Sequence, residues 1–288
     1  MSIPKNHHYV SQCHLREFFN SAEGKIFIYD KEIDNHYYKT TTKTLFSEQF
    51  LNSKEINGEI DHQKLELELK VLIEDEFGNH VERVKSFINN PVDQNRTNES
   101  LIWLSMIGVI GELRHPVFKK SLDSIEEIIT TDLRNDISGD ASHLIKRLFP
   151  GNQRTKYSNI LEYINSACRV LEQMEPLVFG IYFIESDEYF ILPDTSGYQI
   201  RGQFYPVLIR YINQIIQVGF PLSPKIFILA SSRKSGNLPS GICTIKNGNS
   251  DIVYNINKDL LGFAYKAVVC SDKDYLRRFI DKVKTEFT

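Results

Sequence analysis

Histidine, arginine and glutamine side chains are unusually dense near the start of the chain, between His7 and Arg16. An imidazole can act as a general base or a metal ligand, and a guanidinium can hold a phosphate group. Adjacent residues of an extended segment point to opposite faces, so only one of His7 and His8 is expected to face a given site, with the helical His14 as a third candidate. We predict that His8 is catalytic and that His7, Gln12 and Arg16 contact substrate. The alternative is structural: His8 bonds the backbone and Arg16 pairs with a carboxylate.

Charged residues also end the most apolar stretch of the chain, as Glu112, Arg114 and His115. Charges beside a buried helix are costly unless they are paired, so each needs a partner, and a binding site is one way to supply it. We predict that Glu112 and Arg114 are catalytic and that His115 binds substrate. In the alternative, Glu112 pairs with a basic residue and His115 interacts with the last carbonyl groups of its helix.

Asp194 follows an expected strand, in the segment Pro193-Asp194-Thr195-Ser196-Gly197. An aspartate there could bind a metal or orient a histidine, which makes it the fourth candidate catalytic residue, but aspartate is also an ordinary turn former. If Asp194, His8 and Glu112 converged, they would form a hydrolytic or metal-assisted phosphodiester site. A divalent metal would suit such a site, although no residue pattern identifies one.

The composition excludes few classes of function. Charged residues make up 25% and hydrophobic residues 41% of the 288 positions, as in ordinary globular proteins. The net charge of −3 argues against binding nucleic acid over the whole surface, and the basic runs at 147–156 and 277–284 have acidic neighbours typical of solvated helix faces. No phosphate-binding glycine loop, dinucleotide fingerprint, nucleophile elbow or zinc helix is present.

The cysteines and the N-terminal residues indicate the expected cellular compartment. Four widely spaced cysteines form neither a zinc pattern nor a disulfide framework, and the N-terminus lacks the pattern of a signal peptide. No apolar segment approaches the ~20 residues that span a bilayer. We therefore expect a cytoplasmic protein without a membrane segment, whose protein partners and oligomeric state the residues do not indicate.

Hydrophobic spacing predicts the elements that position these residues. The N-terminal part should form a short helix at 11–19 and a strand hairpin at 25–30 and 36–42. A long amphipathic helix is expected at 61–88, and the helix at 101–113 is apolar all round, which favours a central position. Further helices are expected in the middle of the chain at 121–133, 143–149 and 159–174.

Strand patterns return in the C-terminal part. They favour a hairpin at 177–185 and 188–192, further strands at 225–230 and 250–255, and a loop at 231–249. The segment 204–218 keeps helical spacing while its β-branched content would suit a strand, and we expect a helix. Two closing helices should begin at Asn257 and at Ser271, which are suitable N-cap residues.

These elements predict one α+β domain over residues 1–288. It should contain a central helical bundle with a small mixed or antiparallel sheet built from the N-terminal and C-terminal parts. The expected parts are an N-terminal sheet element at 1–55, a helical middle at 56–176, and strands and helices at 177–288.

Several segments resemble a prokaryotic family catalogued as domain of unknown function 4238. The opening His-His-Tyr-Val-Ser-Gln of residues 7–12, the Leu-Arg-Glu-Phe of 15–18 and the Tyr-Asp-Lys of 29–31 match its start, with Ser11 in place of a usual proline. Later matches follow in the family's order at 46–50, 112–116, 190–194, 220–224, Asn257 and Ala264. The resemblance spans nearly the whole chain and implies a shared fold, but no activity is assigned to the family.

The candidate residues together predict a nuclease-type or phosphodiester-hydrolysing effector that acts on a phosphate-bearing substrate or nucleic acid. A link to phage defence follows from the resemblance and rests on no residue. The alternative is non-enzymatic: an interaction module, or a sensor that binds an anionic small molecule or nucleotide. Whether the protein is an enzyme is left open at this point.

Overall fold

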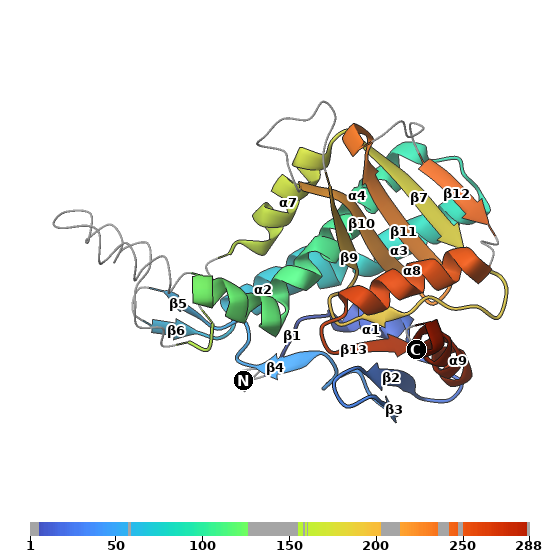
Figure 1. The fold of residues 1–288 in the computed structure, drawn as a ribbon. Helices are drawn as coiled ribbons and strands as arrows, with labels where there is room; N and C mark the ends of the chain where they lie inside the picture. The colour runs from blue at the N-terminus through green and yellow to red at the C-terminus, as the bar shows by residue number, and fades with distance from the viewer. Residues whose placement is uncertain are drawn as a thin grey trace.

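A computed structural model describes residues 6–56, 59–125, 155–157, 159, 161–202, 214–235, 242–246 and 250–286. The fold combines helices with several β-sheets and is α+β, as the sequence predicts (Figure 1). Within these residues no single helix has both the length and the apolar character to cross a membrane. One pair of helices, Gln94–Arg114 and Pro116–Ile125, passes that test only when joined across a bend of 63°.

A five-stranded sheet forms the centre of the molecule. Its strands are β7 (Leu177–Phe183), β9 (Tyr198–Gly202), β10 (Gln214–Ser223), β11 (Ile226–Ser232) and β12 (Ile242–Lys246). They lie in the order β12-β7-β11-β10-β9, and only the β12–β7 pair is parallel. Successive side chains of a strand face opposite ways, so β11 supplies apolar residues to both faces of the sheet, whereas the apolar residues of β10 pack with the cluster on one face.

Helices from the middle of the chain cover one face of this sheet. α3 (Asp75–Asn89), α4 (Gln94–Arg114) and α7 (Tyr163–Met174) pack there with residues such as Val218, Phe220 and Ile228. α4 is buried along most of its length, which explains why its sequence is apolar all round. Within the described residues these three helices of the middle of the chain therefore lie against the sheet, which is their packing partner.

The other face is covered by the two ends of the chain. A four-stranded antiparallel sheet has the order β3-β2-β13-β8, from β2 (Ile26–Asp30), β3 (Asn35–Lys39), β8 (Leu192–Pro193) and β13 (Ala267–Cys270). α8 (Ser250–Phe263) and α9 (Lys273–Glu286) pack with it, as Figure 1 shows in orange and dark red. A sheet built from the N-terminal and C-terminal parts is thus confirmed.

Shorter elements link these layers. β1 (Asn6–His8) pairs with β4 (Ser47–Gln49), and β5 (Lys54–Ile56) pairs with β6 (Glu59–Asp61). α1 (Gln12–Glu17) lies where the sequence predicts a helix. The expected helix at 61–88 consists of α2 (Lys64–Leu69), a π-helical turn η1 (Lys70–Glu74) and α3, so the irregularity falls before Gly78 and not at it.

Several of the C-terminal expectations are wrong. Residues 188–191 form no strand, and the next strand, β8, pairs with β13 because β11 and β12 already occupy both edges of β7. Residues 214–218 begin β10, whereas 203–213 lie outside the described residues. The segment 250–255 is the start of α8, whose buried Val253, Ile256 and Leu260 have helical spacing. Asn257 lies inside α8 and is not its N-cap.

Other expectations fall partly outside the described residues. These include the helices at 121–133 and 143–149 beyond residue 125, and residues 236–241 and 247–249 of the expected loop at 231–249. Within that expected loop, residues 242–246 form β12. At the start of α9, Asp272 accepts a hydrogen bond from the backbone N–H of Tyr275, so the side-chain cap is Asp272 and not Ser271.

Candidate functional site

The two predicted clusters meet where β1 passes the end of α4. Arg114, at the last position of α4, donates a hydrogen bond from its guanidinium to the backbone carbonyl of His8. Both side chains are buried, with exposed fractions of 3% for Arg114 and 8% for His8. The contact joins residues that are 106 positions apart in the sequence. What remains is whether these groups are free to act on a substrate.

The N-terminal histidines are used in contacts with the backbone. His8 Nε2 lies 3.1 Å from the carbonyl oxygen of Lys43, and burial together with the charge of Arg114 lowers its pKa. The Nδ1 atom of His7 accepts a hydrogen bond of 2.9 Å from the backbone N–H of Asn52. These contacts hold β1 against the segment that follows β3, and they match the structural alternative for His8.

His14 is fully buried, as His7 is. Its Nε2 lies 2.6 Å from the carbonyl oxygen of Pro221, so this nitrogen must carry the proton. The ring stacks on Phe220 with 4.5 Å between ring centroids, and Nδ1 has no hydrogen-bond partner among the described residues. Burial lowers the pKa of His14 to about 4. His14 is a neutral residue of the core.

Arg114 forms a buried ion pair beside the histidines. Its terminal nitrogen lies 3.7 Å from Glu66 Oε1, while its Nε has no hydrogen-bond partner within the described chain. A second carboxylate, Glu74, lies near enough for the charge of Arg114 to lower its pKa, but burial has the larger effect and raises it. Removing one member of such a pair would leave a buried charge without compensation, which is costly.

A buried lysine that the sequence reasoning did not single out extends this network. Lys119, on the helix Pro116–Ile125, is 4% exposed. Its three N–H bonds point to three acceptors, the carbonyl oxygen of Leu51 and the amide oxygens of Asn52 and Asn159, at 2.6–2.9 Å. These acceptors favour the ammonium, whereas burial and the nearby Arg114 lower its pKa to about 6. Lys119 ties this helix to the segment after β4.

Asp194 is held by the backbone of another segment. Its two carboxylate oxygens accept hydrogen bonds from the backbone N–H groups of residues 265, 266 and 267 at 2.7–3.1 Å, and it is fully buried. His115 Nε2 lies 3.4 Å from Asp194 Oδ2, and the His115 ring stacks on Tyr265 and contacts the Tyr9 ring edge to face. The carboxylate therefore fixes the start of β13, and its lone pairs are largely occupied.

The remaining predicted residues lie toward solvent. Arg16 is exposed and donates a hydrogen bond of 3.4 Å to Gln12. Glu112 is half-buried, and burial raises its pKa while the charge of Arg201 lowers it. The structure thus brings together His8, Arg114, His115 and Asp194 as a closed network, and leaves Gln12, Arg16 and Glu112 outside it. In the described part of the chain, no group of three or more histidine, cysteine or acidic residues could hold a metal ion.

A second, open site lies between β2, β3 and α9. It is a pocket of about 340 Å³ lined by Phe27, Ile28, His36, Tyr37, Tyr38, Lys273, Leu276 and Arg277. β2 pairs with β3 so that Phe27 lies opposite Tyr38, and Leu276 supplies an apolar contact from the first turns of α9. Tyr38 is 55% exposed, so its ring is accessible. The pocket has apolar walls and polar groups at its rim.

The charge of this pocket is positive. Among the described residues that line it, none is acidic. The side chains of Lys273 and Arg277 form no hydrogen bond or ion pair with any part of the described chain. Burial lowers the pKa of His36, and the positive charges of Arg277 and Lys284 lower it further, while the carboxylates of Asp281 and Asp34 oppose them. Lys25 adds a cation 4.6 Å from the centroid of the Tyr38 ring.

No sequence pattern predicts this pocket. The run at 277–284 has the composition of a solvated helix face, and most of its residues are exposed. Arg277 stands out only through its position opposite β3 in the folded chain. His36 and Arg277 are far apart in the sequence, and the tertiary fold brings them to the same pocket.

Comparisons with known proteins give one match. The model of the family described as protein of unknown function (DUF4238) matches residues 6–274. This span includes β1, the whole of α4 and the first residues of α9. No curated protein and no solved structure matches the chain.

Proposed function

The chain belongs to the DUF4238 family of proteins of unknown function, and we propose that it binds a phosphate-bearing ligand of nucleotide size, without a chemical step, in the pocket between β3 and α9. The observation that carries this proposal is the pair Lys273 and Arg277, two cations without a partner in the described chain, beside the accessible ring of Tyr38. It corresponds to the non-enzymatic sensor that the sequence left open.

The cations suit a phosphate group. A guanidinium can donate two parallel hydrogen bonds to phosphate oxygens, and a lysine ammonium adds a flexible point charge. Lys273 and Arg277 are four residues apart and therefore lie on the same side of α9. Lys273 is also the first residue of α9, where the positive end of the helix dipole favours an anion.

The aromatic and apolar groups suit the rest of such a ligand. A base that stacks on a tyrosine ring gains about 1–3 kcal/mol, and Tyr38 has an exposed face for it. The volume of about 340 Å³ is near the lower end of the range for small-molecule pockets, which favours one nucleotide over a polymer. The net charge of −3 agrees with a local rather than an extended anion-binding surface.

Phosphodiester hydrolysis at the end of α4 remains a prediction. Three of the four groups that would perform it, those of His8, Arg114 and Asp194, are enclosed, and those of His8 and Asp194 are bonded to the backbone. A nuclease and phosphatase screen on the intact protein tests it, with His8→Ala and Arg114→Ala as variants. Activity that both variants lose while they keep the melting temperature would support hydrolysis. A blank screen with early melting of both variants would support the structural assignment.

The binding proposal is tested by calorimetric titration of the intact protein with ATP, ADP, AMP, adenosine and inorganic phosphate. We expect the nucleotides to bind and adenosine to bind more weakly, because it lacks the charge that Lys273 and Arg277 attract. Arg277→Glu should weaken nucleotide binding by about 10- to 100-fold, the worth of a hydrogen bond to a charged group.

Arg278 provides the matched control for this experiment. It is the next residue of the same helix, is exposed, and does not line the pocket. Arg278→Glu makes the same change in net charge and should leave the affinity within about twofold, since exposed charges at a distance are screened. Equal losses in the two variants, or no binding of any nucleotide, would refute the proposal.

A further inference from the structure

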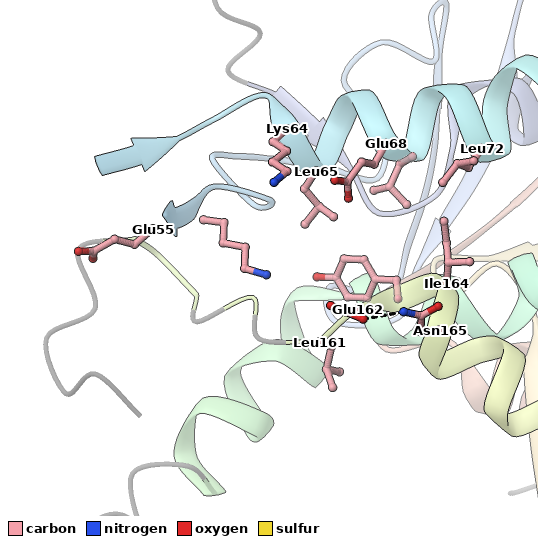
Figure 2. Close-up of a pocket in the computed structure, with 12 residues that line it drawn as sticks. Glu55, Lys64, Leu65, Glu68, Leu72, Leu161, Glu162, Ile164 and Asn165 are labelled. Atoms are coloured by element: carbon pink, nitrogen blue, oxygen red, sulfur yellow. Dashed lines mark hydrogen bonds between the residues drawn. The ribbon is translucent and has the colours of Figure 1, made fainter. Parts of the chain in front are cut away.

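A groove of about 650 Å³ runs between α2–η1 and the start of α7 (Figure 2). Figure 2 shows Leu65 and Leu72 on one wall, with Leu161 and Ile164 on the other. All four are apolar, and all are at least partly accessible to solvent. An apolar groove between two helices can receive the apolar side of a third helix.

The same helical segment carries an apolar ridge beside this groove. Leu67, Val71 and Leu72 are 56%, 58% and 49% exposed, the largest such group on one described helix. Leu67 and Val71 are four residues apart and lie on the same side of the segment. Leu72 lines the groove as well, so ridge and groove form one continuous surface. The alternation of leucine and glutamate in residues 65–69 produces it, because helical leucines at a spacing of two cannot all face the core.

The charges around this surface have both signs. Lys54 and Lys64 lie at the groove with Glu55, Glu68 and Glu162. Lys64 and Glu68, four residues apart on α2, form no ion pair within the described chain. In an interface with two-fold symmetry the same patch occurs twice, so it must carry both partners of each contact. A lysine and a glutamate side by side meet this requirement.

We propose that the occupant of this groove is a second copy of this chain. The ridge of each copy, Leu67 and Val71, lies in the groove of the other, and Lys64 of each copy faces Glu68 of its partner. The surface is one groove and one ridge, at the small end of protein interfaces, so the dimer dissociates on dilution. It lies apart from the β3–α9 pocket and does not depend on ligand binding there.

Analytical ultracentrifugation of the intact protein, from low micromolar to near-millimolar concentration, tests this proposal. The wild type should move from the 33.4 kDa monomer toward twice that mass as the concentration rises. Val71→Lys should raise the dissociation constant more than about tenfold, because it would place an unpaired charge in an apolar groove. Val92→Lys is the control: Val92 is 79% exposed and lies between α3 and α4, so this variant should dimerise as the wild type does.

A charge exchange tests the symmetry itself. Lys64→Glu and Glu68→Lys should each weaken the dimer, because each makes like charges face one another across the two-fold axis. The double variant exchanges both signs on both copies and should restore dimerisation. Both residues are exposed, so the monomer should keep its melting temperature in all three variants. A wild type that stays monomeric at every concentration, or a double variant as weak as the single ones, would overturn the proposal.

Discussion

Acid should destabilise this protein through His14. The ring is buried, its Nε2–H is bound to the carbonyl oxygen of Pro221, and no carboxylate of the described residues acts on its pKa. Its pKa is lowered to about 4 in the folded protein, whereas an unfolded histidine has a pKa of 6.5. Between these values the unfolded state binds the extra proton, so the free energy of unfolding falls as the pH falls from 6.5 to 4. A gap of about 2.5 pH units, at about 1.4 kcal/mol each, is worth about 3.5 kcal/mol in full, of which about 3 kcal/mol is lost by pH 4.

Urea unfolding followed by circular dichroism between pH 7 and pH 4 measures this loss. The comparison is with His14→Gln, which cannot be protonated and which we expect to be less stable than the wild type at pH 7. Other histidines titrate equally in both proteins, so their contributions cancel in the difference. The stability gap between the two proteins should shrink by about 3 kcal/mol as the pH falls to 4. Parallel curves over this range would refute the assignment of His14 as a buried neutral residue.

Three further outcomes follow from the structure. Asp194→Ala would leave the three backbone N–H groups at 265–267 without their acceptor. It should lower the free energy of unfolding, measured with urea, by about 3 kcal/mol or more. An unchanged stability would contradict the structural role of Asp194. Gly111→Ala would place a Cβ atom 2.3 Å from the carbonyl oxygen of Thr195, so we expect a loss of about 1–3 kcal/mol, and a neutral effect in a thermal melt would contradict this contact. Nucleotide affinity should rise as the pH falls, because a bound phosphate raises the lowered pKa of His36. In calorimetry, the affinity of His36→Gln should depend less on pH than that of the wild type. An equal pH dependence of the affinity in both proteins would exclude a role for His36.

Local patterns were sufficient to predict much of the fold. The apolar run of β2 and the apolar spacing of α3, α4 and α7 depend on neighbours within one element, and each of these elements overlaps the segment where the sequence predicts it. The ends differ: α4 begins at Gln94 and not at residue 101, and α7 begins at Tyr163 and not at residue 159. The partners of a strand depend on the whole chain, so the pairing of β7 with β11 and β12 was not predicted. β-branched residues at 252–253 suggested a strand, but packing against β8 and β9 places them in α8.

The sequence predicted where the candidate site lies, but not that its side chains are buried and bonded to the backbone. The residue types identified His8 and Arg114 as candidates, and the two residues are in contact through a hydrogen bond. Their burial and their backbone partners depend on segments far away in the sequence, such as Lys43 for His8. The β3–α9 pocket had no local signal, since its aromatic and basic residues come from opposite ends of the chain.

The central claim, that a phosphate-bearing ligand is held between β3 and α9, is tested most directly by locating a bound nucleotide. Irradiation of the intact protein with an azido-adenine nucleotide, followed by peptide mapping, identifies the residues next to the base. We predict labelling of the peptide that contains Tyr38 or of the one that begins α9, with loss of labelling when excess ATP competes. Labelling confined to other peptides, or labelling that ATP does not reduce, would contradict the account.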